Sequence, residues 1–206
     1  MSQAAPLPRR PKSRDVIIDV AERLWGERGI DAVSLREISA TAGLANPASV
    51  QYHFGGRDEL INAIYTRRLP TIDARRRELL DDALAESSEP HLRTLLDCLF
   101  RPLLEQQGED GRRSYASFLR QVLHFAPATG LRAQAMSLTP ATMDVLSLIE
   151  QAMGDLSAPL IQHRIIAANL LMLDVLIRHD RDPSPDLPIE ALYTDTLDVL
   201  VSGMGG

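Results

Sequence analysis

The stretch from residue 34 to residue 60 constrains the fold more than any other, because its capping and helix-ending residues allow only short helices joined by tight turns. Ser34 and Glu37 have the spacing of a capping box, in which each side chain is expected to bond the other residue's backbone N–H at the start of a helix. Val33 and Ile38 flank this cap with the spacing of a hydrophobic staple. A helix is therefore predicted to begin at Ser34.

A second short helix is predicted to follow after a sharp turn. Gly43 suits the left-handed conformation that ends the first helix. Asn46 is expected to cap the second helix, and Pro47 fits its first turn, where a missing N–H is tolerated. Gly55 and Gly56 end this helix after about two turns. Helix, sharp turn and helix is the geometry that lays a short helix in the major groove of DNA.

The second short helix has an apolar face and a polar one. At about 100° per residue, Val50 and Phe54 point together, toward the core. Small residues on the other face allow close approach to a groove, and serine, glutamine and tyrosine can bond base edges or phosphates. That face exposes Ala48, Ser49 and Tyr52, with Gln51 and His53 on its flanks.

The rest of the chain shows helical periodicity and no strand alternation, which predicts an all-α fold. A helix over 13–28 carries Trp25 as a core anchor, and a long helix over 57–82 is expected to kink or break at Pro70. Further helices are expected after a loop at 86–90. They span roughly 90–106, 112–125, 129–153, 157–180 and 188–202.

The composition is that of a soluble protein with an ample core: 45% of the 206 residues are hydrophobic and 24% are charged. The single cysteine, Cys98, rules out an internal disulfide and is compatible with a reducing cytoplasm. The N-terminus has no apolar segment typical of a signal peptide. The longest nearly apolar run, Ile165–Ile177, is too short to span a bilayer. We therefore expect a cytoplasmic protein without a membrane partner.

The net charge of −6 is unevenly distributed. Residues 1–68 carry 10 basic against 8 acidic side chains, whereas residues 69–206 carry 12 against 20. Local charge decides whether a face attracts phosphates, so the asymmetry weakly favours nucleic-acid binding by the N-terminal part. The basic residues near the N-terminus form either a solvated tail or a phosphate or minor-groove contact. They are Arg9, Arg10, Lys12 and Arg14.

Three spaced motifs occur in order within about fifty of the 206 residues. They are Ala21-x-x-Leu24-Trp25-x-x-x-Gly29, Ser34-x-x-x-Ile38-x-x-x-Ala42-Gly43-Leu44 and Val50-Gln51-Tyr52-His53-Phe54-Gly55-x-Arg57-x-x-Leu60. In this order they resemble the tetracycline-repressor (TetR) family of bacterial transcriptional regulators. The C-terminal domain of that family varies too much in sequence to be matched residue by residue.

The resemblance implies a homodimer that binds a near-palindromic operator in double-stranded DNA. It also implies release of that operator when a small molecule occupies the C-terminal domain. Ser34 and Arg57 would contact phosphates, and Tyr52 and His53 would contact the backbone near the recognition helix.

One departure from the family pattern lies in the turn. Nine residues separate Gly43 from His53, one more than is usual in the family, which leaves open which of residues 46–49 reach bases. We predict a DNA-binding domain at 12–55, a larger effector-binding and dimerisation domain at 57–203, and a disordered arm at 1–11. The predicted DNA contacts are Ser34, Asn46, Ala48, Ser49, Gln51, Tyr52, His53 and Arg57.

A largely apolar effector is expected to bind among the helices of the C-terminal part. Aromatic and methionine side chains at helical spacing could line its pocket, although such residues more often form plain core. Asn169 lies in an apolar run and needs a partner across a dimer seam, on a ligand or on a neighbouring helix. One of Arg75–Arg77 could also turn inward. The candidates are Phe100, Tyr115, Phe118, Arg120, His124, Met136, Met143 and Asn169.

The last two predicted helices have wide apolar faces, which either pack inward or meet their symmetry mates as a four-helix bundle. Periodicity alone narrowly favours inward packing. The family resemblance favours a dimer through these two helices.

Two other classes of protein compete with this interpretation. An enzyme or metal site needs convergent residues, yet none of the histidines at 53, 91, 124, 163 and 179 has another histidine within helical reach. Phosphate-binding, dinucleotide-binding and nucleophile-elbow motifs are absent from the sequence. We therefore expect no catalysis, no cofactor and no metal. A helical ligand-binding or interaction protein without a DNA role is the other alternative, and the exposed face of the second short helix disfavours it.

Overall fold

The computed structural model describes residues 13–108, 110–125, 135–154 and 156–204. These residues form helices, with one isolated bridge between Ser184 and Leu187 and no strand, so the predicted all-α fold is confirmed. The predicted arm at 1–11 lies outside the described residues. The helices are α1 (Ser13–Arg28), α2 (Leu35–Thr41), α3 (Ser49–Phe54), α4 (Arg57–Glu86), α5 (Leu92–Glu105), α6 (Ser114–Phe125), α8 (Pro140–Ala152), α9 (Ala158–Arg181) and α10 (Ile189–Met204).

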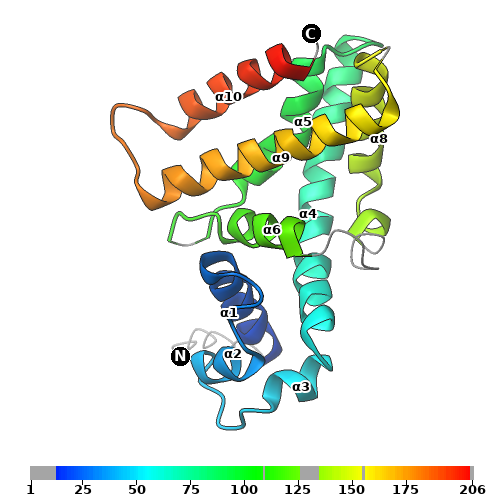
Figure 1. Ribbon diagram of the computed structural model, residues 1–206. Coiled ribbons are helices and arrows are strands. Elements are labelled where there is room, and N and C mark those ends of the chain that lie inside the picture. Colours follow the sequence, from blue (N-terminus) through cyan, green and yellow to red (C-terminus); the bar gives the residue numbers. More distant parts are fainter. Residues whose placement is uncertain (1–12, 109, 126–134, 155, 205–206) are drawn as a thin grey trace, which may run out of the picture.

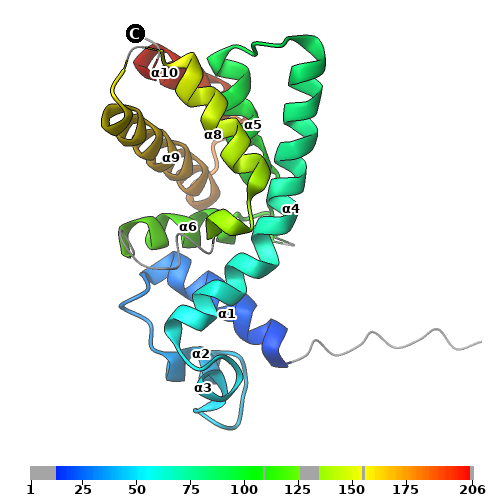
Figure 2. The ribbon, with the colours of Figure 1, turned by 90° about the vertical axis from the view of Figure 1, so that its right-hand side faces the viewer.

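The helices are arranged along one long axis (Figure 1). Helices α1, α2 and α3 form one end of the molecule, and α5, α8, α9 and α10 form the other. Helix α4 leaves the first group and runs the whole length of the second, as Figure 2 also shows. Helix α6 lies across the middle and packs against both α1 and α9. It therefore connects the two ends independently of α4.

Helix α1 is fixed by an apolar face centred on the only tryptophan of the chain. Ile17, Ala21 and Trp25 are fully buried, and the Trp25 indole Nε1–H donates to the Val33 carbonyl at 3.3 Å. Gly29 follows α1 in the left-handed conformation, with φ of 95°. The predicted bounds of this helix and the role of Trp25 as a core anchor are confirmed.

Helix α4 is continuous through Pro70, so of the two outcomes expected at this residue, a kink or a break, the break does not occur. A proline inside a helix removes one backbone hydrogen bond and costs about 3 kcal/mol. Buried apolar side chains on both sides, Leu69 and Ile72, offset that cost by packing the helix into the core. Packing has here overridden the local preference, and α4 extends four residues beyond the predicted end at 82.

Helix α8 begins at Pro140, so the single helix predicted over 129–153 is wrong. Residues 126–134 lie outside the described residues, and Leu138 and Thr139 interrupt the helical geometry before Pro140. Asp73 of α4 caps the new start: its carboxylate accepts the N–H groups of Ala141 at 2.9 Å and Thr142 at 2.8 Å. This cap comes from another helix, so local patterning could not reveal it.

Helices α9 and α10 pack against each other and cover the far end of the molecule. By length and composition, α9 is the one helix among the described residues that could cross a membrane, with a mean hydropathy of 1.6. It is longer than the apolar run identified in the sequence. Only 33% of its most apolar stretch is buried. Apolar side chains therefore remain exposed on its outer face, among them Leu160, Ile166 and Leu171.

The crossing of α1 and α6 combines close backbone approach with buried charge. A Cβ atom at Gly26 would lie 2.9 Å from the Phe118 backbone nitrogen, so only glycine fits without a shift. Glu22 is 1% exposed and accepts two hydrogen bonds from Arg68 of α4, at 2.8 and 2.7 Å. Its carboxylate also accepts the Ser114 hydroxyl of α6 at 2.5 Å. One buried carboxylate thus joins α1, α4 and α6.

Candidate nucleic-acid interface

The start of α2 is capped largely as its sequence predicts. The Ser34 hydroxyl oxygen accepts the Glu37 N–H at 3.2 Å, and the staple residues Val33 and Ile38 are fully buried. The reciprocal bond of the predicted capping box is not formed among the described residues, because the Glu37 carboxylate pairs with Arg28. Ser34 itself is exposed.

The turn between α2 and α3 is longer than predicted. Gly43 adopts the left-handed conformation, with φ of 69°, as its sequence position predicts. Asn46 accepts the Ala48 N–H through its side-chain Oδ1 at 2.9 Å, but α3 begins only at Ser49. Pro47 therefore lies in the turn and not in the helix, and the extra residue noted in the sequence lengthens the turn instead of α3.

Buried contacts hold the inner face of α3. Val50 and Phe54 are buried, as predicted. The Val50 N–H donates to the buried Ser39 hydroxyl of α2 at 3.4 Å, which ties the two short helices together. Arg14 of α1 donates to the His53 carbonyl at 3.1 Å, and its guanidinium lies 4.4 Å from the centre of the Phe54 ring. Sequence reasoning missed Ser39, whose partner is eleven residues away.

The outer face of α3 is open. Tyr52 is 84% exposed, and its ring meets that of His53 edge-on at 5.3 Å between centroids. Ala48 and Gln51 are exposed, whereas Ser49 and His53 are partly buried. Two of the polar side chains are occupied locally. Ser49 donates to the Asn46 carbonyl at 2.6 Å, and the Gln51 amide donates to the Gly55 carbonyl. The Tyr52 side chain, by contrast, lies open to solvent.

Arg57 opens α4 next to this face. Its guanidinium pairs with Asp31 at 3.0 Å, and the Asp31 side chain is 79% exposed. An ion pair this open to water contributes only about 0–1 kcal/mol. A phosphate oxygen could therefore replace the carboxylate at small cost. The eight predicted DNA contacts lie directly before α2, in the turn between α2 and α3, on α3 and at the start of α4, at one end of the molecule (Figure 1).

The residues predicted to bind an effector are not gathered around one cavity among the described residues. Phe100, Tyr115 and Phe118 are buried core side chains. The Phe118 ring contacts Trp25, Tyr65 and Tyr115 at centroid distances of 6.3, 6.0 and 6.1 Å. Burial raises the pKa of Tyr115 far above its ordinary value, so the hydroxyl stays protonated.

The remaining candidates are dispersed. Met136 is 46% exposed, Met143 is partly buried, and the side chain of His124 lies outside the described residues. Asn169 donates to the Ile165 carbonyl of its own helix at 2.8 Å, a partner that differs from the three considered from the sequence. Of these candidates, Arg120 lines a cavity between α1, α6 and α9.

One arginine of the 75–77 run turns inward, as the sequence allowed. Arg76 is 6% exposed and donates to the Leu99 carbonyl at 3.0 Å and to Thr142 at 2.8 Å. Burial lowers its pKa to about 10. The Arg76 guanidinium thus bonds groups of the protein itself and does not line an open pocket. Among the described residues, no group of three or more histidine, cysteine or acidic side chains is placed to hold a metal ion.

Residues 17–64 match the family model described as bacterial regulatory proteins, tetR family. The chain is 36% identical over 75 residues to the HTH-type transcriptional regulator BetI of Rhizobium meliloti. It is 27% identical over 81 residues to the HTH-type transcriptional repressor KstR2 of Mycolicibacterium smegmatis. These matches span 33% and 39% of the two relatives, and 36% and 39% of this chain.

Solved structures extend the likeness in fold to nearly the whole chain. The fatty acid degradation regulator FadR of Bacillus halodurans superposes with a TM-score of 0.59 at 16% identity, covering 92% of this chain and 98% of that one. A TetR family transcription regulator of Marinobacter aquaeolei superposes with a TM-score of 0.59 at 15% identity, covering 90% and 94%. At such identities the likeness establishes the fold alone.

Proposed function

From the match of residues 17–64 to the tetR family of bacterial regulatory proteins, we propose that the protein is a transcriptional regulator that binds specific DNA. The observation that carries the proposal is the outer face of α3. That face presents Tyr52, 84% exposed, beside small and polar residues, while Val50 and Phe54 fix the helix from behind. A short, exposed, well-anchored helix is suited to lie in the major groove.

Each predicted DNA contact has a role in this proposal. Tyr52, Ala48 and Gln51 face the groove, and His53 and Arg57 meet phosphates beside α3. Ser34, exposed at the start of α2, meets a phosphate as well. Asn46 and Ser49 shape the turn, because the Asn46 side chain accepts the Ala48 N–H and the Asn46 carbonyl accepts the Ser49 hydroxyl. These bonds set how deeply the first turn of α3 enters the groove.

The remaining parts of the proposal concern the rest of the chain. Residues 12–55 form the DNA-binding domain, and residues 57–203 bind a small-molecule effector and dimerise. The protein acts in the cytoplasm as a homodimer on a near-palindromic operator, and effector binding releases that operator by a population shift. The exposed apolar side chains of α9 and α10 support dimerisation through these two helices. We also propose that the protein has no catalytic activity.

The test of the function is DNA binding with and without the tyrosine ring. Fluorescence anisotropy on duplexes from the region upstream of the protein's own gene should detect a preferred site, with affinity that falls steeply between about 50 and 200 mM salt. Tyr52→Ala should weaken binding at that site about tenfold, or ~1.4 kcal/mol, without loss of stability. Leu187→Ala, at an exposed position far from α3, is the matched control.

Two results would contradict this function. Binding that is equally weak on every duplex and insensitive to salt would favour a helical interaction protein without a DNA role. Unchanged affinity of Tyr52→Ala at a confirmed site would remove Tyr52 from the interface.

The dimer has its own test. Light scattering at micromolar concentration should report twice the mass of the chain. Leu171→Glu, which puts a charge on the exposed apolar face of α9, should shift the protein toward a monomer. A wild-type monomer under these conditions would rule out the proposed dimer.

A further inference from the structure

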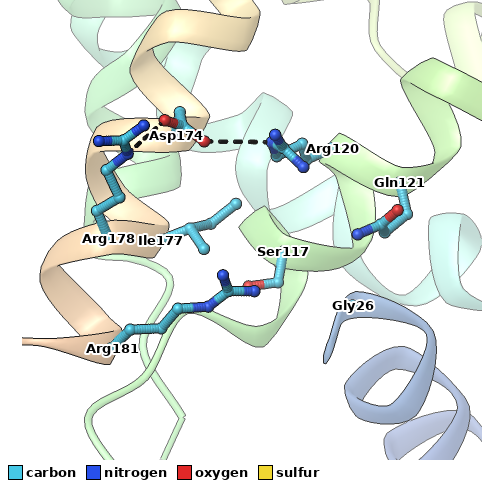
Figure 3. Close-up of a pocket in the computed structure, with 8 residues that line it drawn as sticks. All are labelled: Gly26, Ser117, Arg120, Gln121, Asp174, Ile177, Arg178 and Arg181. Carbon is cyan, nitrogen blue, oxygen red and sulfur yellow. Dashed lines mark hydrogen bonds and ion pairs between the residues drawn. The ribbon is translucent and has the colours of Figure 1, made fainter. Parts of the chain in front are cut away.

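The cavity between α1, α6 and α9 differs in character from the apolar pocket expected from the sequence. It has a volume of about 290 Å³. Figure 3 shows its walls: Gly26 from α1, then Ser117, Arg120 and Gln121 from α6, and Asp174, Ile177, Arg178 and Arg181 from α9. Three arginines face one carboxylate, so the lining is positive within a chain whose net charge is −6.

The arginines are incompletely neutralised. Asp174 is shared: its carboxylate lies 2.6 Å from the Arg178 Nε atom and 3.4 Å from the Arg120 Nε atom. Arg181 forms no ion pair with any other described residue. The neighbouring acid, Asp180, is not available to it, because that carboxylate is bound by the buried Arg113. The site thus holds guanidinium donors whose geometry matches a carboxylate.

The other walls narrow the choice of ligand. Ser117 and Gln121 add neutral hydrogen-bonding groups, and Ile177 adds a short apolar wall. The volume lies at the lower limit of ordinary ligand sites, about 300 Å³, which excludes bulky molecules. These features fit a small organic acid with a short aliphatic body.

The cavity is mechanically connected to the DNA-facing end. Ser117 both lines the cavity and touches Gly26, where an added Cβ would lie 2.9 Å from the Ser117 Cβ. A ligand that displaces α6 must therefore displace α1. At the opposite end of α1, Arg14 holds the end of α3 through the His53 carbonyl and the Phe54 ring. Helix α1 therefore extends from the cavity to α3.

We propose that this cavity binds a small organic carboxylate between Arg120 and Arg181, and that its occupancy shifts α1 and thereby changes the affinity of α3 for DNA. The second half of this proposal rests on the proposed function, whereas the first half does not. The bound carboxylate replaces Asp174 as the partner of Arg120 and supplies Arg181 with a counter-ion.

Isothermal titration calorimetry of the full chain without DNA tests the site. The probes are glutarate, its neutral diamide glutaramide, and inorganic phosphate. Glutarate is expected to bind and glutaramide is not. Arg120→Gln and Arg181→Gln should each weaken glutarate binding about tenfold, or ~1.4 kcal/mol, because each removes a hydrogen bond between charged groups. Asp174→Asn should strengthen it, because the competing carboxylate is gone.

A control variant distinguishes the loss of an arginine that lines the cavity from a change in the net charge of the protein. Arg93→Gln removes the same charge from α5, where Arg93 pairs with Asp198 away from the cavity, and should leave glutarate binding unchanged. Circular dichroism should show wild-type helix content for every variant. If glutarate fails to bind, or binds equally to the Arg181→Gln and Arg93→Gln variants, the site is refuted. Arginine-dependent binding of phosphate alone would overturn the assignment to a carboxylate.

The proposed effect of the ligand on DNA affinity is measured in a separate experiment. Saturating glutarate should change wild-type affinity for the preferred duplex at least about threefold, and should leave that of Arg181→Gln nearly unchanged. Glutarate that binds without altering DNA affinity would overturn the coupling. A wild-type protein that binds no DNA would refute the proposed function while calorimetry still decides the site.

Discussion

Helix α3 and the junction of α1, α4 and α6 are built in opposite ways. The side-chain bonds on the outer side of α3 and in its turn are local, since Asn46, Ser49 and Gln51 each bond a residue two to four positions away, in contact with water. The junction depends on the buried Glu22, whose partners Arg68 and Ser114 lie 46 and 92 residues along the chain. The comparison indicates that the outer surface of α3, which we propose faces DNA, can change with little loss of stability, while the junction sets its position.

The largest effect is expected at the buried carboxylate. Glu22→Ala leaves Arg68 partly buried without its partner and removes the acceptor of Ser114, so the free energy of unfolding should fall by about 3 kcal/mol. Urea denaturation followed by circular dichroism measures this. The matched control is Glu27→Ala, which removes an exposed pair with Arg23 on the same helix and should cost less than about 0.5 kcal/mol. Equal losses in the two variants would show that the junction is not special.

The next effect concerns two helical glycines. Gly26→Ala brings a methyl group to 2.9 Å from the Phe118 backbone nitrogen and should destabilise the protein by about 1–2 kcal/mol. Gly203→Ala in α10 meets nothing within 4 Å, so the better helix propensity of alanine should stabilise it by about 0.5–1 kcal/mol. The melting temperatures of the two variants measure these effects. A decrease for Gly26→Ala and an increase for Gly203→Ala would support the close approach of α1 and α6 at Gly26. Stabilisation by both substitutions would argue against it.

The smallest effect on stability is expected at the interface. Arg57→Ala should cost less than about 0.5 kcal/mol of unfolding free energy, because its pair with Asp31 is exposed. Its effect should appear on DNA, as weaker binding to all sequences and a salt slope reduced by roughly one unit. Asp31→Asn should act in the other direction by removing the competing carboxylate. A loss confined to one preferred sequence would contradict a phosphate contact.

The sequence predicted the features whose causes are local. Helix α1, the Ser34 cap, the left-handed Gly43 and the opposite faces of α3 all follow from residues within one or two turns of each other. The predicted start of α3 was wrong because Asn46 caps a turn instead of the helix itself. The backbone N–H of Val50 bonds the Ser39 hydroxyl of α2, a contact between helices that local spacing does not reveal.

Features with distant causes could not be predicted. Nothing near Pro140 indicates that Asp73, 68 residues earlier, will cap α8. Nothing near Gly26 indicates that Arg120 and Arg181 will line a cavity with it. The aromatic residues proposed for an effector pocket were identified by helical spacing, which is the same for a core and for a cavity. Phe100, Tyr115 and Phe118 are core residues because neighbouring side chains fill the space around them.

The position of Trp25 makes the junction observable without a label. It is the only tryptophan in the chain, it is fully buried, and its ring stacks on Phe118 of α6. Any separation of α1 from α6 would admit water to the indole and shift its emission to longer wavelength. Intrinsic fluorescence therefore reports on the surroundings of one residue at this junction, and stopped-flow recording can time the opening of the junction against the proposed release of DNA.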